Sequence, residues 1–151
     1  NHWLFKSEPT AYSYGHLVED NIAEWDGVRN FQARNFLRDN IKVNDLVLFY
    51  HSNTKPIAVI GTAIVIREGY PDHTAWGTDS DHTDPRSTVE NPIWYMVDIK
   101  ASQYFNKPVT FKAMRNNPAL KDMVLLRKGM RLSIQPVTQE QFEAICDMGS
   151  V

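Results

Sequence analysis

The sequence has little of what marks several large classes of protein. Its 151 residues include one cysteine, Cys146, which excludes an intrachain disulfide and a zinc site built on several cysteines. Its longest apolar runs, such as residues 57–60 and 63–66, are far too short to span a membrane. No charged-then-apolar signal segment opens the sequence. We therefore expect a reducing, cytoplasmic setting and no membrane partner.

Familiar enzyme signatures are missing as well. The sequence contains no GxxxxGK[ST] or GxGxxG phosphate loop and no GxSxG nucleophile elbow. Its five histidines form neither an HExxH motif nor a close pair suited to zinc. The loop 79–84 offers oxygen ligands to a hard cation but lacks the glycine and the terminal glutamate of a calcium-binding hand. We expect no metal and no cofactor, and the balance is against enzymatic activity without excluding it.

The formal net charge is only -2, which by itself gives no sign of a nucleic-acid partner. The charges are nevertheless unevenly distributed. Residues 29–67 carry six cations and two anions, and residues 99–134 carry eight cations and one anion. Residues 68–98, between them, carry seven anions and one cation. A fold that gathers the two basic segments on one face would therefore give a surface for phosphates, although such runs are also typical of an ordinary solvated surface.

Length and composition predict one globular domain over residues 1–151. Hydrophobic residues make up 42% and charged residues 23%, which is ordinary for a folded protein and wrong for a disordered one. Side chains that cap helices stand at Ser13, Asn30, Thr110 and Thr138, the last in a capping box with Gln141. We expect helices over about 13–20, 31–40, 110–116 and 138–148, and strands over 2–6, 46–51, 57–67, 93–105, 123–126 and 131–135.

These elements predict an α+β fold. The segment 57–67 is the strongest strand, and Gly61 within it indicates a bulge or a barrel bend. Residues 71–92 hold several prolines and many Asp, Thr and Ser residues, which predicts a long polar loop. Short strands without regular βαβ alternation favour a small mixed β-barrel or curved sheet with short flanking helices.

Polar and aromatic side chains gather where strands and turns end. Lys6, Ser7 and Glu8 close the first strand, and Trp25 stands in a glycine turn before the helix start at Asn30. The run 50–52 adds a tyrosine, a histidine and a serine. Bases stack on aromatic rings, carboxylates accept hydrogen bonds from exocyclic amines, and arginine and lysine hold phosphates. The pattern therefore fits a pocket for a base extruded from its helix, although composition alone favours core packing of the two rings, with the polar groups as turn caps.

Several motifs resemble those of EVE-domain proteins. They are WLFKSEP at 3–9, WDGVRNFQARNFL at 25–37 and LFYHS at 48–52, together with AW at 75–76, WYMVD at 94–98 and LRKG at 126–129. Phe31 departs from the tyrosine expected there. The resemblance implies a PUA-like β-barrel with flanking helices and a kinship with YTH domains, which hold methylated adenine in an aromatic cage. In that comparison Ser7 matches the Lys-Ser position and Trp25 the cage tryptophan. Glu8 stands where YTH domains usually have a different polar residue, so methyladenine is a poor fit.

The resemblance implies a reader of modified bases in DNA, with modified cytosine as the expected target and DNA favoured over RNA. The expected ligand pocket comprises Lys6, Ser7, Glu8, Trp25, Gly27, Val28, Asn30, Gln32, Tyr50, His51 and Ser52. The expected phosphate-binding residues are Arg29, Arg34, Arg38, Arg127, Lys128 and Arg131. We expect a monomer that binds nucleic acid.

Two other hypotheses stay open at this point. The first is an enzyme for a small or nucleotide-derived substrate, with Glu8 or His51 as the acid/base and Lys6 nearby. The second is a protein-interaction module that uses the acidic segment 68–98 as its contact surface.

Overall fold

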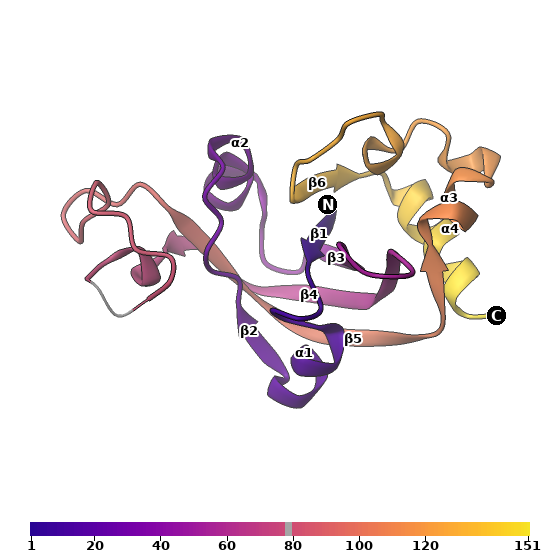
Figure 1. Ribbon diagram of the computed structural model, residues 1–151, viewed down its shortest axis with the longest axis horizontal. Coiled ribbons are helices and arrows are strands. Elements are labelled where there is room, and N and C mark those ends of the chain that lie inside the picture. Colours follow the sequence, from indigo (N-terminus) through magenta and orange to yellow (C-terminus); the bar gives the residue numbers. More distant parts are fainter. Residues whose placement is uncertain (78–79) are drawn as a thin grey trace.

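A single mixed sheet of six strands organises the chain (Figure 1). The computed structural model describes residues 1–77 and 80–151. Its strands are β1 (His2–Ser7), β2 (Ile22–Glu24), β3 (Leu46–His51), β4 (Ala58–Pro71), β5 (Tyr95–Thr110) and β6 (Ile134–Val137). Its α-helices are α1 (Tyr14–Asp20), α2 (Phe31–Asn35), α3 (Phe111–Arg115) and α4 (Gln139–Gly149). A π-helical turn, Phe36–Asn40, continues α2, and 3-10 turns cover His73–Ala75, Pro118–Leu120 and Val124–Leu126.

The sheet is open, with strand order β2-β5-β4-β3-β1-β6. β1 and β3 pair in parallel, and the other neighbours pair antiparallel. The α+β class expected from the sequence is confirmed, but the expected closed barrel is wrong. The two outer strands have only 3 and 4 residues, and β6 contains Pro136, a residue that sheets tolerate at their edges. Such short outer strands leave the described sheet with two edges.

Local signals in the sequence located most elements correctly. Ser13, Asn30, Thr110 and Thr138 each accept a backbone hydrogen bond as helix caps, as expected. The expected strand 123–126 is wrong, because residues 124–126 form a 3-10 turn that buries Leu125. The last strand begins at residue 134 instead of 131.

Other differences concern length and coverage. β2 was not expected as a strand, and β4 and β5 reach further than the predicted segments. Two predictions fall partly outside the described residues, because both include residue 79. They are the polar loop over 71–92 and the loop 79–84 that was considered as a cation site. No helix in the described part of the chain is long and apolar enough to cross a membrane.

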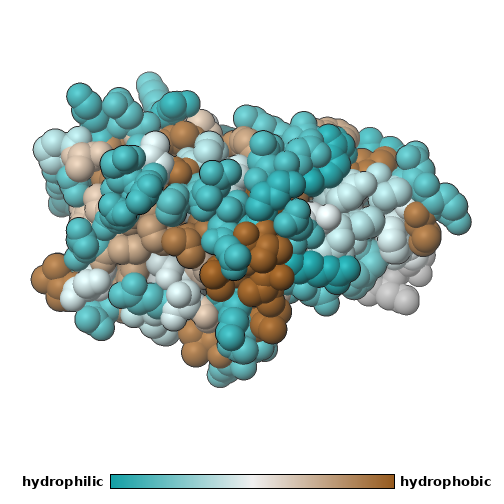
Figure 2. All heavy atoms as spheres, turned by 180° about the vertical axis from the view of Figure 1, so that it is seen from behind, coloured by the Kyte–Doolittle hydropathy of each residue, from teal (hydrophilic) through white to brown (hydrophobic). Residues whose placement is uncertain are grey.

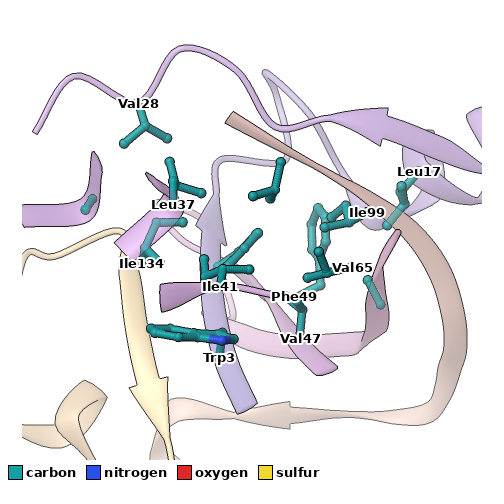
Figure 3. Packing of buried hydrophobic residues seen from close by; sticks show 14 of the residues in the cluster. Trp3, Leu17, Val28, Leu37, Ile41, Val47, Phe49, Val65, Ile99 and Ile134 are labelled. Atoms are coloured by element: carbon teal, nitrogen blue, oxygen red, sulfur yellow. The ribbon is translucent and has the colours of Figure 1, made fainter. Parts of the chain in front are cut away.

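The strand periodicity separates the apolar side chains into two clusters. Phe5 and Phe49 belong to a cluster that also receives side chains from α1 and α2, part of which Figure 3 shows around Trp3 and Ile41. Tyr50, with the other alternate residues of β1 and β3, belongs to a second cluster formed with α3 and α4. Successive side chains of a strand point to opposite faces, which accounts for the division. One outer face of the protein is mostly hydrophilic, with a smaller hydrophobic area in its lower middle (Figure 2).

Gly61 marks a bulge in β4, as the sequence indicated. The pairing register shifts on both sides of it. A Cβ atom at this position would lie 2.6 Å from the Gln103 carbonyl oxygen and 2.6 Å from Cζ of Tyr14. The glycine therefore allows the Tyr14 ring to pack directly on the strand, where its hydroxyl donates to the Thr62 carbonyl over 2.8 Å.

Asp72, just after β4, ties distant segments of the chain together. Its side chain is entirely buried. It accepts hydrogen bonds from the Gly27 N–H over 2.9 Å, from Nη1 of Arg29 over 2.9 Å and from the N–H and hydroxyl of Thr74. Burial alone would raise the pKa of Asp72, but the bonds from Thr74, Gly27 and Arg29 outweigh it and hold the pKa below its usual value. The carboxylate thus fixes the loop between β2 and α2.

We predict that Asp72→Ala lowers the free energy of unfolding by about 3 kcal/mol, because it leaves a half-buried arginine and a backbone N–H without their acceptor. Because the folded-state pKa lies below the ordinary 3.8, this contribution is complete well above that pH and is lost as pH falls through the folded-state value. Urea denaturation at several pH values measures it. Asp81→Ala, at an exposed position in the following loop, is the matched control and should change stability by less than about 0.5 kcal/mol.

Candidate functional site

A cleft of about 1200 Å³ opens beside the loop that Asp72 fixes. It lies against residues from β1, β2, β4 and the segments that follow them. Its lining consists of Lys6, Ser7, Glu8, Ala11, Tyr12, Asp20, Ile22, Ala23, Glu24, Trp25, Asp26, Gly27, Val28, Arg29, Arg67, Tyr70, Pro71, His73, Trp76, His82, Asp98 and Ser133. Aromatic rings and carboxylates thus share its walls.

Trp25 is the aromatic residue that the first hydrophobic cluster places in the cleft wall. Its ring lies 5.4 Å from the ring of Phe5 and, edge to face, 5.4 Å from the ring of Phe49. The Tyr12 ring lies 6.2 Å from the Trp25 ring, also edge to face. The Trp25 backbone N–H donates to the Val97 carbonyl over 2.8 Å. The half-buried indole is therefore held on several sides while it still borders the open space.

The end of β1 supplies three polar groups to the same cleft. The Lys6 ammonium donates to the Met130 carbonyl over 3.2 Å, and partial burial lowers its pKa. The Ser7 hydroxyl donates to the Tyr12 carbonyl. The Glu8 side chain is exposed and accepts only a long hydrogen bond, 3.5 Å, from the Asn53 amide. Lys6 and Ser7 thus brace the cleft, and Glu8 remains available to a ligand.

Gly27 has a left-handed backbone with φ of 76°. A Cβ atom here would lie 2.8 Å from the His82 ring, so both the conformation and the close approach require glycine. The Arg29 guanidinium, two residues on, donates to the His82 carbonyl over 3.0 and 2.6 Å. The segment 80–84 is thereby brought against the cleft.

A further part of the cleft lining was not identified from the sequence. The Tyr70 hydroxyl donates to the Asp98 carboxylate, with the Glu24 carboxylate 3.5 Å away, and the Arg67 guanidinium lies 3.5 Å above the Tyr70 ring. His73 Nε2 lies 3.0 Å from the Glu24 carboxylate. The sequence could have indicated Tyr70 only if the strand predicted over 57–67 had been extended to residue 71. Tyr70 then pairs with β5 in the sheet.

Six of the expected pocket residues line the cleft, namely Lys6, Ser7, Glu8, Trp25, Gly27 and Val28. Asn30, Gln32, Tyr50, His51 and Ser52 do not. Asn30 is occupied as the cap of α2. Tyr50 is buried on the other face of the sheet, where burial raises its pKa to about 12. His51 Nε2 accepts the Tyr14 backbone N–H over 3.0 Å, and burial lowers the pKa of the imidazole.

The expected phosphate-binding residues fall into two groups. Those of the first basic segment have partners: Arg29 binds Asp72 and His82, Arg34 binds the Ile93 carbonyl, and Arg38 pairs with Asp39. Those of the second, Arg127, Lys128 and Arg131, are exposed and form no ion pair with any described residue. Their loop adjoins the cleft, because Met130 and Ser133 bond to Lys6.

The acidic segment 68–98 is partly internal. Asp72 is buried, and Asp84 accepts hydrogen bonds from Arg86 and Trp94, which hold its pKa low. The charge of the segment is therefore not simply presented to a partner. Within the described ranges, no group of three or more His, Cys, Asp or Glu side chains is placed to hold a metal ion.

The chain is similar to known proteins over nearly its whole length. The EVE domain family matches residues 1–148. Human thymocyte nuclear protein 1 is 37% identical, over 98% of this chain and 73% of its own length. A hypothetical protein from Leishmania major superposes with a TM-score of 0.92 at 40% identity, covering 98% of this chain and 93% of that one.

Human thymocyte nuclear protein 1, also called THYN1, has itself been solved with a ligand. The human THYN1 protein, solved in complex with DNA that contains 5-methylcytosine, superposes with a TM-score of 0.90 at 36% identity, covering 99% of this chain and 98% of that chain. The family match and this superposition each cover nearly the whole sequence. This chain belongs to the EVE domain family.

Proposed function

We propose that this protein reads a modified cytosine in DNA and holds the extruded base in the cleft beside Trp25. The observation that carries the proposal is the likeness to the THYN1 protein in complex with 5-methylcytosine DNA, combined with a braced indole in the cleft wall. The single-domain organisation, the monomeric state and the cytoplasmic setting stay predictions from the sequence.

The cleft suits a nucleotide in size and in chemistry. Its volume of about 1200 Å³ exceeds the roughly 300–1,000 Å³ of ordinary small-molecule sites, which leaves ample room for an extruded base. Trp25 offers a π-surface for stacking, and Glu8 offers an acceptor for an exocyclic amine. Enzymes that act on a base extrude it from the duplex, because they cannot reach it within the stack. A reader that holds the base in a cleft must extrude it for the same reason.

The phosphates are assigned to the loop that carries Arg127, Lys128 and Arg131. Five carboxylates line the cleft itself, so the backbone of DNA is better accommodated outside it. The loop adjoins the cleft at Lys6, and its cations are exposed. Arg29, Arg34 and Arg38 already have protein partners, so their expected contribution to phosphate binding is smaller.

Trp25→Ala should weaken binding of a 5-methylcytosine oligonucleotide about tenfold or more, because stacking of a base on an aromatic ring is worth roughly 1–3 kcal/mol. Fluorescence anisotropy with a labelled oligonucleotide measures the affinity. Trp25→Phe keeps a ring and should retain part of the binding. Tyr104→Ala removes an exposed aromatic residue outside the cleft and should bind normally. Unchanged affinity in a folded Trp25→Ala protein would refute the proposed pocket.

Replacing Arg127, Lys128 and Arg131 together by glutamine should weaken DNA binding and flatten its salt dependence. Each lost phosphate contact reduces the slope of log affinity against log salt by about 0.9 on duplex DNA. The control replaces Lys107, Lys112 and Lys121, three exposed cations of the same basic segment that do not line the cleft. A larger change of slope in the control than in the loop variant would contradict the assignment.

A further inference from the structure

Asp26 is a fixed part of the cleft wall whose side chain has no assigned role. The backbone around it is anchored on both sides: the Asp26 N–H donates to the Glu24 carbonyl over 2.9 Å, and the next N–H, of Gly27, donates to Asp72. Asp26 lines the cleft next to Trp25, and its carboxyl group forms no ion pair with any residue in the described part of the chain. The structure thus presents a free carboxyl group on a rigid backbone beside the stacking surface.

The surroundings of Asp26 favour its neutral form. Partial enclosure raises its pKa, and the nearby carboxylates of Asp72 and Glu24 raise it further. His82 is the neighbour that lowers it, and the Arg29 guanidinium is engaged with Asp72 and the His82 carbonyl. Uptake of a proton by Asp26 therefore costs less than at an ordinary exposed aspartate.

A neutral carboxyl group complements cytosine in a way that a carboxylate does not. The Watson–Crick edge of cytosine offers an amino donor at N4 beside an acceptor at N3. A protonated carboxyl group offers an acceptor beside a donor, so both hydrogen bonds form. A carboxylate has only acceptors, and one of them would face the N3 lone pair. Thymine instead offers a donor at N3, which a carboxylate accepts directly.

We propose that Asp26 reads the Watson–Crick edge of the extruded cytosine as a neutral carboxylic acid, so that binding of the base takes up one proton. This inference rests on the proposed function and names the residue that sets the identity of the base. The proton moves from solvent to the Asp26 carboxyl group, and no covalent bond to the base forms. The 5-methyl group lies on another edge of the ring, so Asp26 selects cytosine and other residues contact the modification.

The test compares two oligonucleotides that differ at one base, 5-methylcytosine or thymine. Both bases carry the 5-methyl group and differ in the Watson–Crick edge. Affinities of the wild type and of Asp26→Asn are measured from pH 5.5 to pH 8. The wild-type preference for 5-methylcytosine should fall as pH rises, approaching tenfold per pH unit above the pKa of the bound carboxyl group. Asparagine offers the same acceptor and donor without titrating, so the preference of the variant should not change with pH.

The design separates Asp26 from other titrating groups. A change in charge away from the base alters attraction to the phosphates of both oligonucleotides alike, so it cancels in the ratio of affinities. Glu19→Gln, an exposed charge on α1 that does not line the cleft, should keep the wild-type pH dependence. Asp26→Ala should lose the preference at low pH.

A wild-type preference that does not change with pH, or a pH dependence that persists in Asp26→Asn, overturns the assignment of Asp26. If the Trp25 variants still lose binding in that case, the proposed function survives without it. If wild-type protein binds neither oligonucleotide at any pH, the proposed function itself fails.

Discussion

The buried carboxylate of Asp72 holds together the parts of the chain that form the cleft. It follows the last residue of β4, and two of its partners, Gly27 and Arg29, lie more than 40 residues away in the loop between β2 and α2. Through the Gly27 N–H it fixes the backbone beside Trp25, and through Arg29 it brings the segment around His82 against the same opening. A hydrogen-bonded ion pair at this depth is costly to leave incomplete, which makes the loop rigid. A rigid wall reduces the ordering that a bound base requires.

The two faces of the sheet have different roles. Side chains of β1 and β3 alternate, so Phe5 and Phe49 support the Trp25 indole on one face, while Tyr50 joins the cluster under α3 and α4 on the other. Trp25 and Tyr50 were expected in one pocket from the sequence, but the same alternation puts them on opposite faces of the sheet. Of these two residues, Trp25 borders the cleft, where we propose that the base stacks, and Tyr50 stabilises the fold.

Structural features that depend on local interactions were predicted correctly from the sequence. Helix caps such as Asn30 and the bulge at Gly61 depend on neighbouring residues and on simple steric rules, and both are present. Features decided by pairing between segments distant in the sequence were not predicted: the open sheet, the short strand β2 and the full length of β4. The residues of the candidate site show the same difference between local and long-range features. Residues next to Trp25 in a recognisable run were located, whereas Tyr70 reaches the cleft only through the pairing of β4 with β5.

The central claim is that a modified cytosine leaves the DNA helix and contacts Trp25 in the cleft. Intermolecular nuclear Overhauser effects between the 5-methyl protons of the base and the indole protons of Trp25 test it most directly. The account predicts such contacts in the complex, together with the loss of contacts from that methyl group to the neighbouring bases of the duplex. A methyl group that keeps its contacts to the stacked neighbours, with none to Trp25, would contradict the account.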